Sequence, residues 1–132
     1  MSSKFLVVDP GVMASDGDLH FVAKGSTKYG GFTVVDAWAT VGGATNAGTS
    51  FRLVLQNYGI SGTVAGGTVG TVGGTTDPFA ADTPKQFSLT DANVFIDAGE
   101  WLVLKKVEQN DSDLNAESSI IIEIVDGVVT QG

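Results

Sequence analysis

Cysteine is absent from this 132-residue chain, and lysine and arginine are scarce. Without cysteine there is no disulfide framework, no thiolate nucleophile and no thiolate-ligated metal. The 7 basic residues stand against 15 acidic ones, so the formal net charge is −8. Proteins that bind nucleic acid neutralise its phosphates with clustered lysine and arginine, and anionic membranes attract the same clusters. The composition therefore disfavours nucleic acid and membranes as partners.

Long apolar runs are also missing. No run approaches the roughly 20 apolar residues that a membrane helix requires. The apolar run at residues 5–8 stops at Asp9-Pro10, and no small-residue cleavage site follows it. Such a run is too short for the core of a signal peptide. We expect a protein that is made in a cytoplasm and is either kept there or assembled there into something larger.

Histidine occurs once, at His20. A metal-binding cupin needs at least two imidazoles at its metal, and a Ser-His-Asp hydrolase needs a serine held beside its histidine. The nucleophile-elbow pattern G-x-S-x-G is only approached at residues 59–63, where the last glycine is displaced. A small hydrolase is therefore the least favoured function. We expect no enzyme activity and no cofactor, and we expect His20 to be a solvent-facing strand residue.

Carboxylates are plentiful but form no recognisable site. An EF-hand calcium loop that began at Asp111 would need Gly at position 116 and Glu at position 122, where the sequence has Ala116 and Ile122. We interpret residues 110–115 as a solvated loop, with a looser surface calcium site as the alternative. Asp97 and Glu100 flank a turn, where carboxylates have ordinary turn-forming roles.

Glycine is abundant, at 18 residues, and Val, Thr and Ile are frequent. Short β-branched runs are separated by Gly, Asn and Asp, and no segment has sustained helical periodicity. This pattern predicts a single-domain, all-β, jelly-roll-like β-sandwich of about eight strands. Few strands are joined by two-residue turns, which favours jelly-roll or Greek-key crossings over a meander. An immunoglobulin-like sandwich is the alternative, although its Cys–Trp–Cys signature is missing.

Three stretches support this fold most clearly. Phe51, Leu53 and Leu55 alternate with more polar neighbours, which predicts one inward strand face. The alternating isoleucines of residues 120–124 predict a central strand. Residues 94–104 predict two strands joined by a hairpin turn or tight corner at Asp97-Ala98-Gly99.

Two segments have alternative interpretations. Residues 1–13 form either an N-terminal arm or the first strand, ahead of a sandwich domain at residues 14–132. The triplet Gly-Thr-Val occurs at residues 62–64, 67–69 and 70–72. These triplets fit an extended edge segment with glycine at its bends, and the alternative is a flexible binding loop or a strand donated to a partner.

The large aromatic residues divide into two groups. Trp38 and Trp101 lie within apolar runs, which predicts core positions. Tyr29 and Tyr58 lie in loops, which predicts surface contacts. Because exposed tyrosines can stack on sugars, the alternative function is a carbohydrate-binding β-sandwich module.

A longer pattern links these segments. It reads GGFTVVDA at residues 30–37, AGTSFRLVL at 47–55, GTV at 67–69, GGT at 73–75, TPKQF at 83–87 and IDAGEWLV at 96–103. With this pattern, residues 5–126 resemble the small jelly-roll proteins encoded beside the capsid genes of tailed bacteriophages, which are capsid decoration (cement) proteins. The shared motifs are turns and strands rather than catalytic residues.

The resemblance implies a non-enzymatic structural protein that binds the outer surface of a phage capsid and stabilises the head, often as a homotrimer. Its partner would be the major capsid protein, and its location the virion exterior after synthesis in the host bacterial cytoplasm. The N-terminal segment of such proteins can reach out as an arm, here residues 2–13. The candidate contacts, between subunits or with the capsid, are Phe5, Val7, Asp9, Pro10, Tyr29 and Tyr58.

Overall fold

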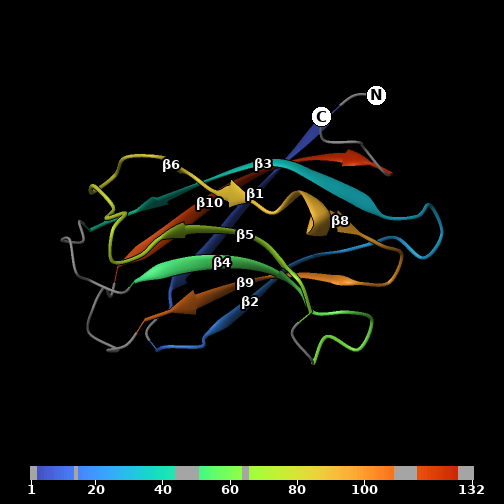
Figure 1. Cartoon of the computed structure of the whole chain (residues 1–132), viewed down its shortest axis with the longest axis horizontal. Coiled ribbons are helices and arrows are strands. Elements are labelled where there is room, and N and C mark those ends of the chain that lie inside the picture. The colour runs from blue at the N-terminus through green and yellow to red at the C-terminus, as the bar shows by residue number, and fades with distance from the viewer. Residues whose placement is uncertain (1–2, 14, 44–50, 64–65, 109–115, 128–132) are drawn as a thin grey trace.

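The structure is a computed structural model that describes residues 3–13, 15–43, 51–63, 66–108 and 116–127. Within these residues, ten strands form two packed antiparallel sheets (Figure 1). Sheet A contains β1 (Ser3–Val12), β3 (Phe32–Val41), β6 (Lys85–Gln86), β8 (Phe95–Ile96) and β10 (Glu117–Asp126). Sheet B contains β2 (Leu19–Lys24), β4 (Arg52–Asn57), β5 (Thr68–Gly73), β7 (Ser88–Leu89) and β9 (Trp101–Val107). A 3-10 turn, η1, spans Asp91–Asn93, and no helix in the described part of the chain is long and apolar enough to cross a membrane.

The strand pairing is nested. Sheet A has the order β1-β10-β3-β6, with β8 also beside β3, and sheet B has the order β2-β9-β4-β5-β7. The first strand therefore pairs with the last, β2 pairs with β9, β3 pairs with β6 and β8, and β4 pairs with β5. Most successive strands cross from one sheet to the other. This arrangement is that of a long hairpin rolled into a sandwich, and it confirms the predicted jelly-roll-like fold.

The strand count exceeds the expected eight because one strand position is interrupted. Gln86 of β6 lies opposite Trp38, and Ile96 of β8 lies opposite Phe32, along the same edge of β3. Between these two pairings the chain leaves sheet A and forms β7 at the edge of sheet B. β6 and β8 thus act as two halves of one strand, which leaves eight strand positions and the two-residue β7.

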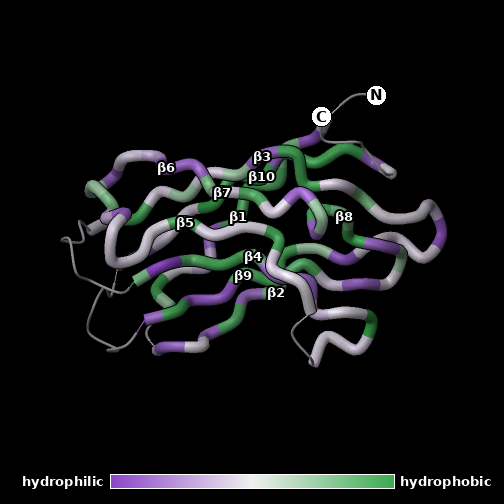
Figure 2. Tube along the Cα trace, viewed as in Figure 1, coloured by the Kyte–Doolittle hydropathy of each residue, from purple (hydrophilic) through white to green (hydrophobic). Residues whose placement is uncertain are grey.

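The core lies between the two sheets and follows the period-two alternation of the strands. Figure 2 shows hydrophobic and hydrophilic stretches alternating along the strands of both sheets. The predicted inward face of residues 51–55 is confirmed, because Phe51, Leu53 and Leu55 are all buried. The predicted central position of residues 120–124 is also confirmed, because β10 lies between β1 and β3. The core residues with no exposed surface include Val34, Ala37, Ala39, Ile120, Ile122, Leu53, Leu55, Leu102 and Leu104.

The first strand does not stop at Asp9-Pro10. Val8 lies opposite Ile120 and Gly11 lies opposite Ser118, so two residues of β1 face one residue of β10. This β-bulge accommodates the proline, which has no N–H to donate and is tolerated at bulges of edge strands. Residues 3–12 therefore pair as a strand within their own chain, while exchange of this segment between copies stays a prediction.

A bulge in β2 reverses the expected orientation of its residues. Phe21 lies opposite Val103, but Ala23 lies opposite Leu102, so Val22 is the extra residue. Leu19 and Phe21 lie opposite Lys105 and Val103, on the outer face of sheet B, and are 41% and 43% exposed. The prediction that His20 faces solvent is wrong. It lies opposite the buried Leu104, on the inner face, where it is half-buried at the open side of the sandwich.

The stretch at residues 94–104 is a corner between the sheets rather than a hairpin. Ile96 belongs to sheet A and Trp101 belongs to sheet B. The Glu100 carboxylate accepts hydrogen bonds from the Asp97 N–H at 2.8 Å and from the Asn57 side-chain amide at 3.0 Å. The expected turn-forming role of Asp97 and Glu100 is therefore confirmed.

Candidate interaction surface

The outer face of sheet A carries exposed apolar side chains beside a free strand edge. β1 pairs with β10 on one side, and no described strand pairs with its other side. Phe5 and Val7 are 60% and 67% exposed, and Ile121, opposite Val7, is 41% exposed. We call these three residues the apolar stripe. Trp38 of β3 lies opposite Ile121 and extends the same row across the sheet.

The strand alternation explains why these side chains face outward. Leu6 and Val8 point inward and pack in or against the core, so Phe5 and Val7 point away from it. Single exposed apolar residues are common on protein surfaces, but adjacent ones beside an unpaired strand edge mark a contact surface. The apolar stripe is the clearest such surface in the described residues.

The structure places five of the six predicted contact residues at least partly in solvent. Phe5 and Val7 lie in the apolar stripe, and Asp9 and Pro10 form the bulge of the same strand. Tyr29 is 80% exposed, and the Lys28 ammonium lies 5.1 Å from the centroid of its ring.

Tyr58 is the exception, since it is only 6% exposed. Its ring centroid lies 6.2 Å from that of Phe21, which in turn packs edge-on against Trp101 at 5.5 Å. The prediction of a surface position for Tyr58 is wrong because this aromatic cluster on the outer face of sheet B covers it.

Both tryptophans were expected in the core, and this prediction is wrong. Trp38 lies on the outer face of sheet A, because its neighbours Ala37 and Ala39 take the inner positions of β3. Trp101 lies on the outer face of sheet B, opposite Lys24, whose ammonium is 5.3 Å from the ring centroid. Both residues are half-buried.

A hollow of about 410 Å³ joins the free edge of β1 to the loop that carries Tyr29. Lys4 and Leu6 of β1 line it together with Tyr29 and with Lys24 of β2. The structure therefore brings Tyr29 close to the predicted N-terminal contact segment, which the sequence alone could not show.

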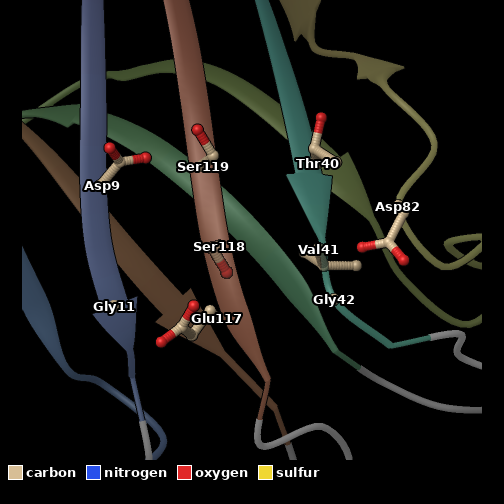
Figure 3. Close-up of a pocket in the computed structure, with 9 residues that line it drawn as sticks. All are labelled: Asp9, Gly11, Thr40, Val41, Gly42, Asp82, Glu117, Ser118 and Ser119. Atoms are coloured by element: carbon tan, nitrogen blue, oxygen red, sulfur yellow. The ribbon is translucent and has the colours of Figure 1, made fainter.

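A second hollow, of about 580 Å³, lies at the end of sheet A and is lined by Asp9, Asp82 and Glu117 (Figure 3). Asp9 projects from β1, whereas Asp82 lies beyond β3, with β10 between them. Within the described residues, no group of three or more His, Cys, Asp or Glu side chains is placed to hold a metal ion. The three carboxylates thus do not converge.

The remaining sequence candidates are Ser61, the Gly-Thr-Val region and the calcium-loop candidate. The Ser61 hydroxyl pairs with that of Thr63 at 3.0 Å, within its own loop. Residues 68–73 of the Gly-Thr-Val region form β5, of which β7 covers only Gly70 and Thr71. The calcium-loop candidate at residues 110–115 lies outside the described residues.

A buried ion pair was missed by the sequence analysis. The Lys106 ammonium lies 2.9 Å from the Glu108 carboxylate, and neither side chain has exposed surface. The Glu108 N–H donates a hydrogen bond to the Asp16 carboxylate at 2.8 Å. The signal was present, because Lys106 continues the inward alternation of Leu102 and Leu104. Since the pair is sealed from solvent, we assign it a structural role.

The comparisons with known proteins identify no relative of this chain. No protein-family model matches this chain, and neither the curated proteins nor the solved structures yield a match.

Proposed function

We propose that this chain is a non-enzymatic structural protein of a tailed-phage head. It binds the outer surface of the capsid, with the major capsid protein as its partner, and it associates with further copies of itself, as a homotrimer. It acts on the virion exterior after synthesis in the host bacterial cytoplasm. The observation that carries the proposal is the apolar stripe of Phe5, Val7 and Ile121 beside the free edge of β1.

Exposure of the apolar stripe to water is energetically unfavourable. Complete burial of one Val or Phe side chain is worth about 1.5–3 kcal/mol. Covering Phe5 and Val7 between subunits or against the shell recovers part of this free energy at every copy. On a symmetric shell, such contacts are repeated many times, so modest individual affinities combine into stable attachment.

Charge and shape support the same role. A net charge of −8 keeps free copies soluble and limits random association before assembly. The compact sandwich folds around its own core without disulfides or metal ligands in its described part. The resemblance of residues 5–126 to capsid decoration proteins supplies the identity of the partner.

The test uses purified protein and undecorated heads of the phage that encodes it. We expect the chain to bind these heads and to raise their disruption temperature. The double variant Phe5→Ser, Val7→Ser should bind at least about tenfold more weakly, because it removes the stripe. Ile60→Ser is the matched control, since Ile60 is 72% exposed but lies in a loop outside the stripe.

Two results would overturn the proposal. Absence of binding of the unmodified chain to its own undecorated heads rejects the capsid role. Equal binding by the stripe variant and the Ile60→Ser control shows that the stripe is not the contact surface.

The carbohydrate-binding alternative has less support than the capsid role. It relied on Tyr29 and Tyr58 as a stacking pair, and burial of Tyr58 removes one of the two.

A further inference from the structure

The two sheets have opposite charge. The strands of sheet B contain no Asp or Glu, although they contain Lys24, Arg52, Lys105 and Lys106, four of the 7 basic residues in the chain. The strands of sheet A contain five carboxylates, namely Asp9, Asp36, Glu117, Glu123 and Asp126. A strongly acidic protein thus presents one sheet on which the strand charges are all positive.

The cations of sheet A are already neutralised within the chain. Lys4 pairs with Asp126 at 3.2 Å, and Lys85 pairs with Asp77. Arg52 and Lys105 of sheet B, in contrast, have no ion pair with any described residue. Their charge is available to a partner.

Arg52 and Lys105 border one hollow on the outer face of sheet B. Arg52 lies opposite Gly73 and Val107, and Lys105 lies opposite Val54. The hollow has a volume of about 390 Å³, and no carboxylate of the described residues lines it.

Gln56 in the same hollow has a side-chain oxygen that is buried and lacks a hydrogen-bond partner among the described residues. Buried polar atoms without a partner are uncommon in folded proteins and call for a donor. Leu19 and Phe21 add exposed apolar surface at the β2 edge of this face. The face therefore combines positive charge, apolar area and an unused acceptor, as a protein contact does.

The outer face of sheet A is the counterpart. Phe5, Glu123 and Asp36 lie in one row across β1, β10 and β3, next to Val7 and Ile121 of the apolar stripe. This face offers carboxylates together with exposed apolar side chains. The outer faces of the two sheets point away from each other in a sandwich, so they can meet only between different molecules.

We propose that copies of this chain associate head to tail, with the outer face of sheet A of one copy against the outer face of sheet B of the next. Glu123 and Asp36 of one copy face Lys105 and Arg52 of its neighbour. The proposal rests on the association of copies proposed above and names the faces that meet. A contact between two different faces is heterologous. It generates a closed ring, as the homotrimer requires, when the rotation between copies closes, and an open stack when it does not.

The experiment is a charge exchange followed by analytical ultracentrifugation. Lys105→Glu makes the sheet B face less positive, and Glu123→Lys makes the sheet A face less negative. Each variant alone should self-associate on the order of tenfold or more weakly than the unmodified chain, because like charges then oppose each other. The double variant Lys105→Glu, Glu123→Lys should regain association, because every altered face then meets a face of opposite charge.

Asp91→Lys is the matched control, because it makes the same charge change as Glu123→Lys at an exposed residue of η1, outside both sheets. It should associate like the unmodified chain. Circular dichroism confirms that each variant is folded before it is compared.

Three outcomes would overturn the proposal: an unmodified chain that sediments only as a monomer, single variants that associate as strongly as the control, or a double variant that does not regain association. Binding to phage heads is measured separately. If the charge variants behave as expected but the chain does not bind phage heads, only the capsid role is rejected. If the chain binds phage heads but the charge variants do not behave as expected, only the pairing of faces is rejected.

Discussion

Lys106 is a charged residue at a position where the strand pattern calls for an apolar one. It follows Leu102 and Leu104 on the inner face of β9 and lies opposite Leu53. Its charge is compensated by Glu108, two residues later on the same side of the chain, at 2.9 Å. Removing one member of a buried pair leaves the other charge without compensation, whereas replacing both by apolar residues is often neutral or stabilising.

We therefore expect Lys106→Met to lower the free energy of unfolding by about 3–5 kcal/mol. The double variant Lys106→Met, Glu108→Leu should recover most of this loss. Urea denaturation followed by circular dichroism measures both. Lys85→Met is the control, because its pair with Asp77 is partly exposed and should be worth less than about 1 kcal/mol. A small effect of Lys106→Met alone would show that Lys106 does not compensate the buried charge of Glu108.

At the scale of elements, the corner at residues 96–101 depends on two glycines that leave room for its backbone. The Gly25 N–H donates to the Glu100 carbonyl oxygen at 2.8 Å, and the Gly99 N–H donates to that of Gly25 at 2.8 Å. A Cβ atom at Gly25 or Gly31 would lie 2.0 Å from the carbonyl oxygen of Asp97 or Ile96, respectively. Those neighbours are backbone atoms, which cannot rotate away as a side chain can.

Gly31→Ala should therefore lower the free energy of unfolding by about 1–3 kcal/mol or more, because it overpacks the corner. Gly42→Ala is the matched control, since the nearest atom to its added Cβ would be 3.6 Å away. Denaturation midpoints of the two variants measure the difference. Equal stability of both variants would mean that the backbone of the corner can shift to accommodate a Cβ atom. Close packing at Gly31 would then not be needed where the chain crosses between the sheets.

At the scale of the whole molecule, the nested pairing makes the two ends of the chain depend on each other. β1 pairs with β10 from Ser3 opposite Val125 to Val12 opposite Glu117. The pairing joins segments that are far apart in sequence, so much chain must be ordered before it forms, and such folds form slowly. β1 also covers one edge of β10, the strand that carries Ile120 and Ile122 into the core.

A chain that lacks residues 1–12 should lose cooperative thermal unfolding or aggregate, because β10 then becomes an uncovered edge. Thermal circular dichroism and size-exclusion chromatography measure this outcome. Removal of residues 1–2 alone is the control and should leave the melting temperature unchanged within about 2 °C. If the longer truncation were as stable as the full chain, residues 3–12 would be a dispensable arm.

Much of the fold could be predicted from the sequence because its signals are local. The alternation at residues 51–55 and 120–124 identified two inner faces, since successive strand residues point to opposite sides wherever the strand lies. The turn at Asp97-Ala98-Gly99 could also be predicted from its residue types. The contact segment at Phe5 and Val7 was identified as a candidate, and its outward direction followed once its strand was paired.

Only the tertiary structure decided the features that depend on register and on partner strands. Phe21 faces outward because it pairs with Val103, and the aromatic cluster that it forms there buries Tyr58. Neither effect is encoded within a window of a few residues, because each depends on how distant strands pair. The separation of charge between the sheets arises in the same way. By itself the sequence determined a β-sandwich of net charge −8, whereas the nested topology placed Arg52 and Lys105 on one outer face and Glu123 and Asp36 on the other.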